Sequence, residues 1–320
     1  MAVKTKAVKE IKYKSYKQLF DKYLLLNSSF NYGSNKTYVF RGEGNEHYKL
    51  IPSAFRPSAY SFMNLLLNKL GMTGITQEAI KKDVKLQINA EWIMMRQFFQ
   101  NANMQGLKMP WISDKWMLRM RDDTLNDIYN IDEWIPEDLA EIFAMMQHYS
   151  FPTRMLDWTY NFSVAAYFAS MSAAYRLKEN KARKDENIVV WVMHLATANK
   201  YLTTDDGMPM IKVVIPPYAN NPNLNAQKGV LTYIPINKKQ INENNDPLKS
   251  MTFDNYINRC CMQTRTEDEV ILERALVPIM DCYDMIWDLD ALNVNTLSIY
   301  PGYGSIFRNC MEFIDFGPNG

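Results

Sequence analysis

The sequence predicts an α+β fold, in which helices flank a central mixed or antiparallel sheet and most of the amino-terminal half is helical. Two patterns predict it. Apolar residues recur at helical spacing through residues 57–120, whereas residues 188–195 are apolar on both faces, as in a central strand. The chain has 320 residues, 47% of them hydrophobic and 22% charged, a composition that allows a large buried core.

The chain is predicted to divide into a helical extension over residues 1–36 and a domain over residues 37–315. Within the extension, apolar residues near helical spacing predict a helix over Ile11 to Leu26. The domain contains a helical insertion at about residues 57–135. In this insertion, Gln87 to Asn101 is the clearest helix.

The domain is predicted to begin with a short strand, Thr37 to Gly42, whose β-favouring residues close on a turn and place Arg41 at the strand end. Pro136-Glu137-Asp138 opens a helix through Met146, because Pro and acidic residues favour a first turn. A buried helix is predicted for Ser163 to Leu177, rich in Ala and aromatic residues. Further expectations are a mainly irregular segment over 205–222, a strand over 229–235 and a polar loop over 238–249. Residues 269–279 are predicted as a strand, although their sequence could equally start a helix, and helices are predicted over 284–292 and 306–313.

The net charge of +1 gives no strong overall field, so neither nucleic acid nor an acidic membrane is an expected partner. The Lys-rich start of the chain is not followed by the apolar run of a secretory signal, and no segment approaches the roughly twenty apolar residues of a membrane span. We therefore expect a cytoplasmic protein.

Four cysteines, two of them adjacent at Cys260 and Cys261, predict reduced thiols rather than a disulfide framework. The chain lacks Cys-x-x-Cys and Cys/His spacings and contains three histidines, so no metal site is expected.

The segment Gln147 to Thr159 concentrates polar and aromatic side chains in what we predict to be a turn between two helices. Such a group is costly to bury without a ligand or a mutual network. One interpretation is structural: Arg154 pairs with Asp157 to brace the turn, and His148 caps the preceding helix. The other is a binding or catalytic site, with members His148, Tyr149, Thr153, Arg154, Asp157, Trp158 and Thr159.

Four motifs in order resemble the FRG domain family: Phe40-Arg41-Gly42, then Gln-His-Tyr-x-x-Pro-Thr-Arg-x-Leu-Asp-Trp-Thr running into Ala166-Tyr167-Phe168-Ala169, then residues 225–231, then residues 295–304. The resemblance covers roughly residues 37–313. Ser150 stands where the family usually has Gly, Leu231 replaces an aromatic residue, and the last motif lacks both acidic positions. At position 150, a Ser accepts a positive φ less readily than a Gly does.

The order of elements is also similar to that of ADP-ribosyltransferases, which implies NAD as the substrate. The resemblance then gives Arg41 the role of binding phosphate, because a guanidinium neutralises a diphosphate bidentately. Thr153 and Thr159 become the hydroxyls that hold the nicotinamide ribose, and Tyr149 or Trp158 could stack on a ring.

The catalytic carboxylate is left open by this resemblance. If Gln227 aligns with the first residue of the third family motif, Gly229 occupies the acid position and the site lacks its acid. If residues 267–272 are that motif, Glu269 supplies the acid. Asp157 is the third candidate, and His148 joins these as a possible catalytic group.

Three functions follow as alternatives. The first is an NAD-dependent ADP-ribosyltransferase or NAD glycohydrolase acting as a toxin or in antiphage defence, with a protein target or a neutralising protein partner. The second is a non-catalytic module that binds a nucleotide, dinucleotide or other phosphate ligand through Arg41, Arg154 and Gln227. The third is a structural role for the motif, with partner binding through apolar surface such as Trp111 to Trp116.

Overall fold

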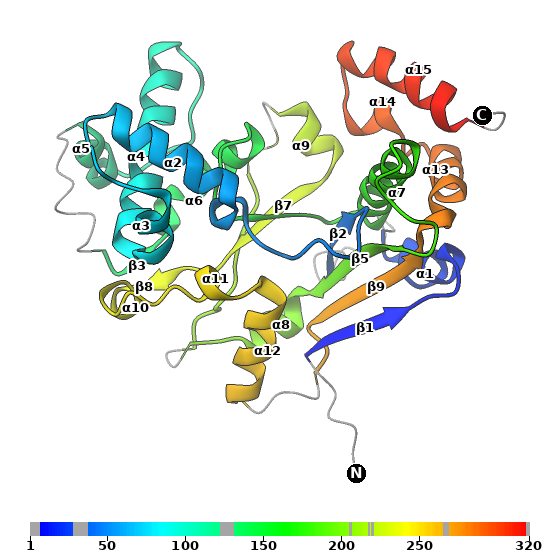
Figure 1. Cartoon of the computed structure of the whole chain (residues 1–320), viewed down its shortest axis with the longest axis horizontal. Coiled ribbons are helices and arrows are strands. Elements are labelled where there is room, and N and C mark those ends of the chain that lie inside the picture. Colours follow the sequence, from blue (N-terminus) through cyan, green and yellow to red (C-terminus); the bar gives the residue numbers. More distant parts are fainter. Residues whose placement is uncertain are drawn as a thin grey trace.

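A computed structural model describes residues 7–27, 38–121, 131–204, 207–216, 218, 221–264 and 269–317. At its centre lies a seven-stranded sheet in the order β1-β9-β5-β2-β4-β7-β6 (Figure 1). Neighbouring strands are antiparallel except for the parallel pair β1 and β9, so the predicted mixed sheet is confirmed. The strands are β1 (Val8–Lys12), β2 (Tyr38–Glu43), β4 (Leu156–Thr159), β5 (Asn187–His194), β6 (Lys212–Val214), β7 (Gly229–Tyr233) and β9 (Leu272–Pro278).

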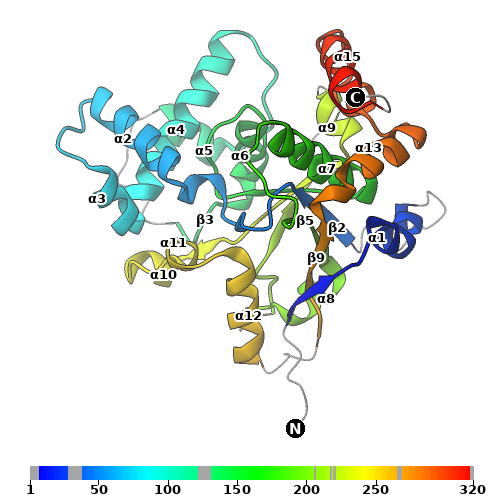
Figure 2. The same cartoon turned by 45° about the vertical axis from the view of Figure 1, so that its right-hand side comes forward.

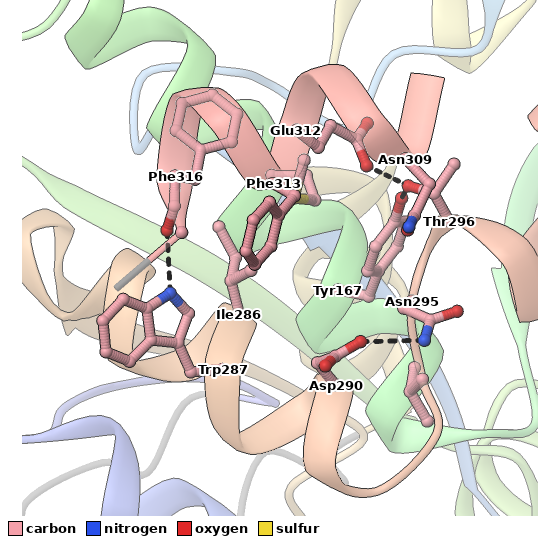
Figure 3. Close-up of a pocket in the computed structure, with 13 residues that line it drawn as sticks. Tyr167, Ile286, Trp287, Asp290, Asn295, Thr296, Asn309, Glu312, Phe313 and Phe316 are labelled. Carbon is pink, nitrogen blue, oxygen red and sulfur yellow. Dashed lines mark hydrogen bonds between the residues drawn. The ribbon is translucent and has the colours of Figure 1, made fainter. Parts of the chain in front are cut away.

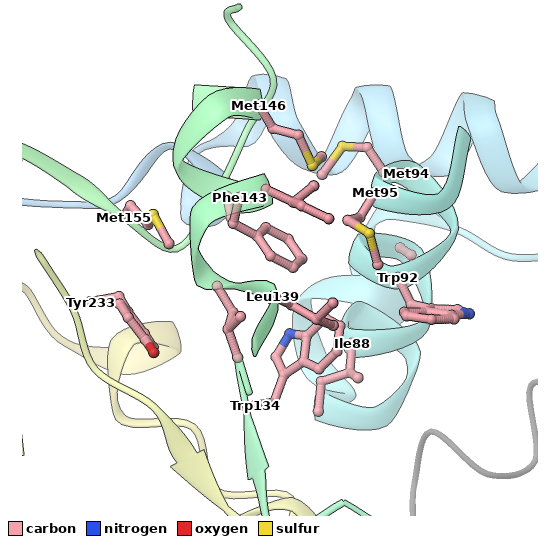
Figure 4. Packing of buried hydrophobic residues seen from close by; sticks show 14 of the residues in the cluster. Ile88, Trp92, Met94, Met95, Trp134, Leu139, Phe143, Met146, Met155 and Tyr233 are labelled. Atoms are coloured by element: carbon pink, nitrogen blue, oxygen red, sulfur yellow. The ribbon is translucent and has the colours of Figure 1, made fainter. Parts of the chain in front are cut away.

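A group of helices at one end of this sheet forms the predicted helical part of the amino-terminal half, on the left of Figure 1. Capping side chains define its helix starts, with Thr76 accepting from Ala79 N and Asp83 from Leu86 N. Its core, drawn in Figure 4, packs Trp134 and Phe143 edge to face between the longest helix and the helix that leads to the central motif. The helices are α2 (Pro57–Lys69), α3 (Gln77–Lys82), α4 (Val84–Met104), α5 (Asp114–Arg121) and α6 (Glu137–His148), and a small sheet of β3 (Glu133–Trp134) and β8 (Ile236–Asn237) lies below.

Two further cores lie on the two faces of the large sheet. On one face, α7 (Phe162–Lys178) packs against β2 and β5 together with α1 (Tyr16–Tyr23) and α13 (Cys282–Ala291). On the other face, α8 (Leu195–Tyr201) and α12 (Phe253–Thr264) cover β5 and β9. The turned view in Figure 2 shows these two groups on opposite sides of the strands. The remaining described helices are α9 (Pro222–Ala226), α10 (Lys238–Asn242), α11 (Pro247–Ser250), α14 (Thr296–Ile299) and α15 (Gly304–Phe316), with 3₁₀ turns at Leu24–Asn27, Ser53–Phe55 and Ile279–Asp281.

The amino-terminal segment differs from the predicted helix over Ile11 to Leu26. It contributes β1, which pairs with β9, before α1 begins after its cap at Ser15. In this strand Val8 and Ile11 are half-buried and the other three residues are exposed, so its sequence lacks the strict alternation that would have indicated a strand. The domain division at residue 37 stays a prediction. Because β1 pairs with β9, residues 8–12 of the predicted extension belong to the central sheet.

Three other local expectations were wrong in part. The segment over 205–222, expected to be mainly irregular, also contains β6, the outer strand beside β7. The polar stretch 238–249 is not a loop, because Asn237 and Asp246 cap the short helices α10 and α11. The segment Gln147 to Thr159 does not join helix to helix directly, because it contains β4.

The ladder between β2 and β4 has one rung, Phe40 opposite Thr159. Each strand is fully paired on its other side, β2 with β5 over six positions and β4 with β7 over four. The sheet is therefore nearly divided between these two strands, and the FRG motif lies at the division.

Candidate functional site

A cleft of about 590 Å³ opens where β2 and β4 part. Its volume lies in the range of sites for small molecules and cofactors. The walls come from β2, β4 and β7, from one side of α7, and from α9 and the segment after α14. Its polar and aromatic lining residues include Arg41, Glu43, His148, Asp157, Thr159, Phe168, Gln227 and Tyr300.

The three residues of the Phe-Arg-Gly motif have different tasks in β2. Phe40 is 1% exposed and packs in the core beneath α7. Arg41 turns to the cleft. Gly42 lies so close to α7 that a Cβ there would stand 1.8 Å from the carbonyl oxygen of Ala165, so a glycine is required for the strand to approach the helix.

Arg41 bridges the divided part of the sheet. Its Nε donates to Glu43 at 2.7 Å and one terminal nitrogen donates to the carbonyl oxygen of Asp157 at 2.9 Å, with the Asp157 carboxylate 3.8 Å away. Burial lowers the pKa of the guanidinium, but the two nearby carboxylates outweigh this and raise the pKa above its ordinary value. The arginine thus remains a fixed cation at the cleft wall.

Asp157 and His148 bring an acid and a base to the same cleft. The Asp157 carboxylate accepts a hydrogen bond from Gln147 Nε2 at 2.8 Å, and its side chain is 60% exposed. Burial lowers the pKa of His148, and the charge of Asp157 opposes this only in part. His148 is therefore neutral at neutral pH and able to accept a proton.

Thr159 and Gln227 meet across β4 and the end of α9. The Thr159 hydroxyl donates to the Gln227 carbonyl oxygen at 2.6 Å and accepts from Asn161 N at 2.9 Å. Farther along the wall, the rings of Phe168 and Tyr300 meet edge to face with centroids 6.4 Å apart. These two rings add aromatic surface to a cleft whose lining also contains Arg41.

Two predicted ligand-binding side chains, Thr153 and Tyr149, do not line the cleft, and the polar atom of a third, Trp158, is already bound within the protein. Thr153 is buried, and its hydroxyl donates to Gln147 at 2.6 Å, so it braces the turn. Trp158 is among the residues that line the cleft, but its indole N–H donates to Thr232 at 2.8 Å and its ring packs in the core with Phe253. Tyr149 is 58% exposed and does not line the cleft.

The predicted pair of Arg154 with Asp157 is wrong. Arg154 is 1% exposed and binds Glu91 at 2.6 Å and Asp246, which come from α4 and from the cap of α11. Trp134 also donates to Glu91. Despite burial, these two carboxylates raise the Arg154 pKa, and the group joins the helical part of the chain to the sheet rather than facing a ligand. The partners lie more than sixty positions away, so local spacing could not indicate them.

Glu269 does not converge with Arg41. It accepts a hydrogen bond from Tyr201 at 3.0 Å, before the start of β9, and does not line the cleft. In the sheet, β5 lies between β9 and β2. Of the carboxylates that the sequence offered for catalysis, Asp157 is the one at the cleft.

Sequence reasoning missed Glu43. It lies two residues after Arg41 on the same strand and is 16% exposed. Side chains at positions i and i+2 of a strand share a face, so the spacing Arg-Gly-Glu could have indicated that this carboxylate accompanies the arginine.

A second cavity, of about 320 Å³, lies between α13 and α15 (Figure 3). Its polar groups already bind one another: Tyr167 contacts Thr296 at 2.5 Å, Thr296 donates to Glu312, and the Trp287 indole donates to the Phe316 carbonyl oxygen at 2.8 Å. This arrangement is a satisfied structural network at the joint between the last helices.

Neither a metal site nor a membrane-spanning helix occurs among the described residues. They contain no group of three or more His, Cys, Asp or Glu placed to hold a metal ion. Within the same ranges, no helix combines the length and apolar character needed to cross a membrane.

Comparison with known proteins gives one match. Residues 36–180 match the family model of the FRG domain, a range that includes β2, β4 and α7 but not the resembling segments at 225–231 and 295–304. No curated protein and no solved structure matches the chain. Residues 36–180 are therefore similar to the FRG domain, as the motifs within that range predict.

Proposed function

We propose that the cleft between β2 and β4 binds NAD and cleaves its bond between nicotinamide and ribose, transferring ADP-ribose to water or to a macromolecule. The observation that carries this proposal is the grouping of Arg41 with two carboxylates, Glu43 and Asp157, at one wall of a cleft with aromatic rings at another. NAD carries both a negative diphosphate and a positive nicotinamide ring. A site with both charges close together suits it.

The chemistry assigns each group a role. Arg41 neutralises a phosphate, and Phe168 or Tyr300 packs against a ring. When the N-glycosidic bond breaks, its electron pair goes to the nicotinamide nitrogen and positive charge develops on the ribose. The carboxylate of Asp157 stabilises that charge, as fixed charges do in a site partly shielded from water. A hydroxyl nucleophile then bonds to the ribose carbon, and neutral His148 accepts its proton.

The test is NAD consumption by purified protein, followed by release of nicotinamide. We expect Asp157→Asn and Arg41→Lys each to reduce turnover by about a hundredfold or more, the usual effect of removing a charge that stabilises a transition state. Glu269→Gln is the matched control, because it removes a carboxylate outside the cleft and should leave turnover unchanged. Loss of turnover in that control, or its absence in the wild type, would remove this proposal.

A second candidate is a nucleotide-binding module without turnover. The exposure of Asp157 favours it, since a carboxylate that is 60% exposed and bound to Gln147 stabilises a cation less than a desolvated one. In this case calorimetry with a panel of nucleotides gives saturable heat that Arg41→Lys weakens, and no product forms.

In the catalytic case, the biological role we propose is that of a toxin or antiphage effector with a macromolecular acceptor or a neutralising protein partner. Growth arrest on expression of the wild type, relieved by Asp157→Asn, is the expected result. Growth arrest by both proteins equally would contradict the role.

A further inference from the structure

We propose that a second cleft, on the face of the sheet covered by α12, binds a small oxyanion ligand through a carboxylate or phosphate group. The cleft measures about 690 Å³ and shares no lining residue with the one between β2 and β4. Strands β1, β9 and β5 form its floor. One wall is the segment of residues 46–49, and the other is the first part of α12.

Trp191, in the floor of the cleft, carries a polar atom without a partner. The side chain is 3% exposed, and its indole N–H finds no acceptor among the described residues. The ring is held in place, because the Arg274 guanidinium lies 5.6 Å above its centroid and Arg274 itself binds Glu10 and the Glu46 carbonyl. Buried donors are almost always satisfied, so a fixed, unsatisfied donor that lines a cleft indicates an acceptor that binds there.

Thr252 supplies a second unsatisfied group on the same cleft. Its hydroxyl is buried without a partner among the described residues, although it directly precedes α12, where a hydroxyl normally caps the helix. Asp254 and Asn255, in the first turn of this helix of 12 residues, also line the cleft. Backbone N–H groups of a first turn attract negative charge. The unused hydroxyl and the helix start therefore add donors beside Trp191.

Two of the three carboxylates in the lining already have partners. Glu10 is bound to Arg274. Glu46 accepts two hydrogen bonds from Asn187, at 3.0 and 3.1 Å. By formal charge the lining sets three carboxylates against Lys49 and Arg274, so the oriented donors, and not the overall charge, must hold an oxyanion. A carboxylate or phosphate oxygen satisfies them.

The proposal is independent of NAD cleavage, although residues of the two sites are neighbours in the sheet. On β5, Trp191 is paired with Arg41 of β2 on one side and with Arg274 of β9 on the other. Arg41→Lys, which tests the NAD cleft, leaves the donors of the second cleft in place. Failure of one proposal thus leaves the other standing.

The experiment is calorimetric titration of the full chain with inorganic phosphate and, separately, with acetate at constant ionic strength. We expect saturable binding of at least one probe, and its identity decides between the two sources. Trp191→Phe keeps the ring and removes the N–H, and Thr252→Val removes the hydroxyl. Each should weaken binding by about tenfold, the effect of losing a hydrogen bond to a charged group. Trp111→Phe, at a Trp that is 77% exposed, is the control and should bind as the wild type does.

A second readout separates binding from folding. Because both groups are unsatisfied without ligand, Thr252→Val and Trp191→Phe should melt at the same or a higher temperature than the wild type in the absence of oxyanion. Added phosphate or acetate should then raise the melting temperature less in the variants than in the wild type. Absence of saturable heat with both probes, or equal affinities in the wild type and both variants, overturns the proposal.

Discussion

Arg41 and Arg154 both lie within residues 36–180, the range that matches the FRG domain. Their surroundings differ, and this difference assigns their roles. Arg41 is 17% exposed, bridges β2 and β4, and faces a cleft. Arg154 is sealed between Glu91 and Asp246 with no face toward that cleft. A buried charge held by two partners acts in folding, whereas a partly exposed one can exchange a protein partner for a ligand.

Breaking the Arg154 group should therefore destabilise the fold without acting on the cleft directly. We expect Glu91→Gln to lower the free energy of unfolding by about 3–5 kcal/mol, because it leaves a buried guanidinium with one carboxylate. Urea unfolding at neutral pH measures it. Asp157→Asn is the matched control, expected to change stability by no more than about 0.5 kcal/mol because the residue is exposed. A large loss in the control would restore the structural role for Asp157.

Ser150 offers a stabilising substitution. It occupies the left-handed region, with φ of 67°, directly after the last turn of α6, where Ser150 N bonds Gln147 O and Phe151 N bonds Met146 O. A residue with a Cβ pays about 1 kcal/mol for this conformation, so Ser150→Gly should raise the free energy of unfolding by about that amount. Ser150→Ala keeps the Cβ and should give no gain. An equal gain from Ala would show that the hydroxyl, not the backbone, is the cause.

At the scale of elements, the contact between β2 and α7 shapes the site, because it fixes the strand that carries Arg41. The strand approaches the helix backbone at Gly42, and the side chain of Phe40 fills the core beside it. Any side chain at position 42 must push strand and helix apart, and the division between β2 and β4 lies directly beside this contact.

Gly42→Ala is expected to be strongly destabilising, by about 3 kcal/mol or more, because the new Cβ meets backbone that cannot move aside cheaply. Gly304→Ala is the matched control: a Cβ at this first residue of α15 meets nothing within 4 Å, so stability should be unchanged within about 0.5 kcal/mol. Thermal unfolding of both variants decides. A mild effect at position 42 would mean that β2 is not held against α7.

The elements that the sequence predicted correctly are those with strong internal patterns. Helix α7 and strands β5, β7 and β9 are buried over most of their length, and the apolar runs in their sequences predict them. Strands β1, β4 and β6 were missed because none of them is a continuous buried run, and their form depends on partners distant in sequence. No local pattern contains that pairing.

At the scale of the whole molecule, pH should act on stability through its histidines. Burial lowers the pKa of His148 below that of the unfolded chain, and the same holds for His194. Below about pH 6.5 the unfolded state thus binds more protons than the folded one, so stability falls as pH falls through that value and is retained above it.

The measurement is the free energy of unfolding from pH 7.5 to 5 for the wild type and for His148→Gln. We expect the variant to lose less stability over this range than the wild type. Parallel curves would mean that burial does not hold the pKa of His148 down.

The candidate site was predictable in part. The motifs brought Arg41, His148, Asp157, Thr159 and Gln227 into consideration, and the fold places all five at one cleft. Residue type alone could not tell Thr159, which lines the cleft, from Thr153, which does not, because this depends on where β4 begins. Likewise Glu269 had a suitable sequence context, but strand order separates it from Arg41.

The single rung between β2 and β4 has a mechanical meaning. Within each half of the sheet the strands are fully paired. Between β2 and β4, the pairing of Phe40 with Thr159 is supplemented by the hydrogen bond from the Arg41 side chain to the Asp157 carbonyl oxygen. An anion that binds this guanidinium would compete with the Asp157 carbonyl oxygen and so weaken the contact between β2 and β4. Occupancy of the cleft and the angle between the two halves of the sheet would then change together.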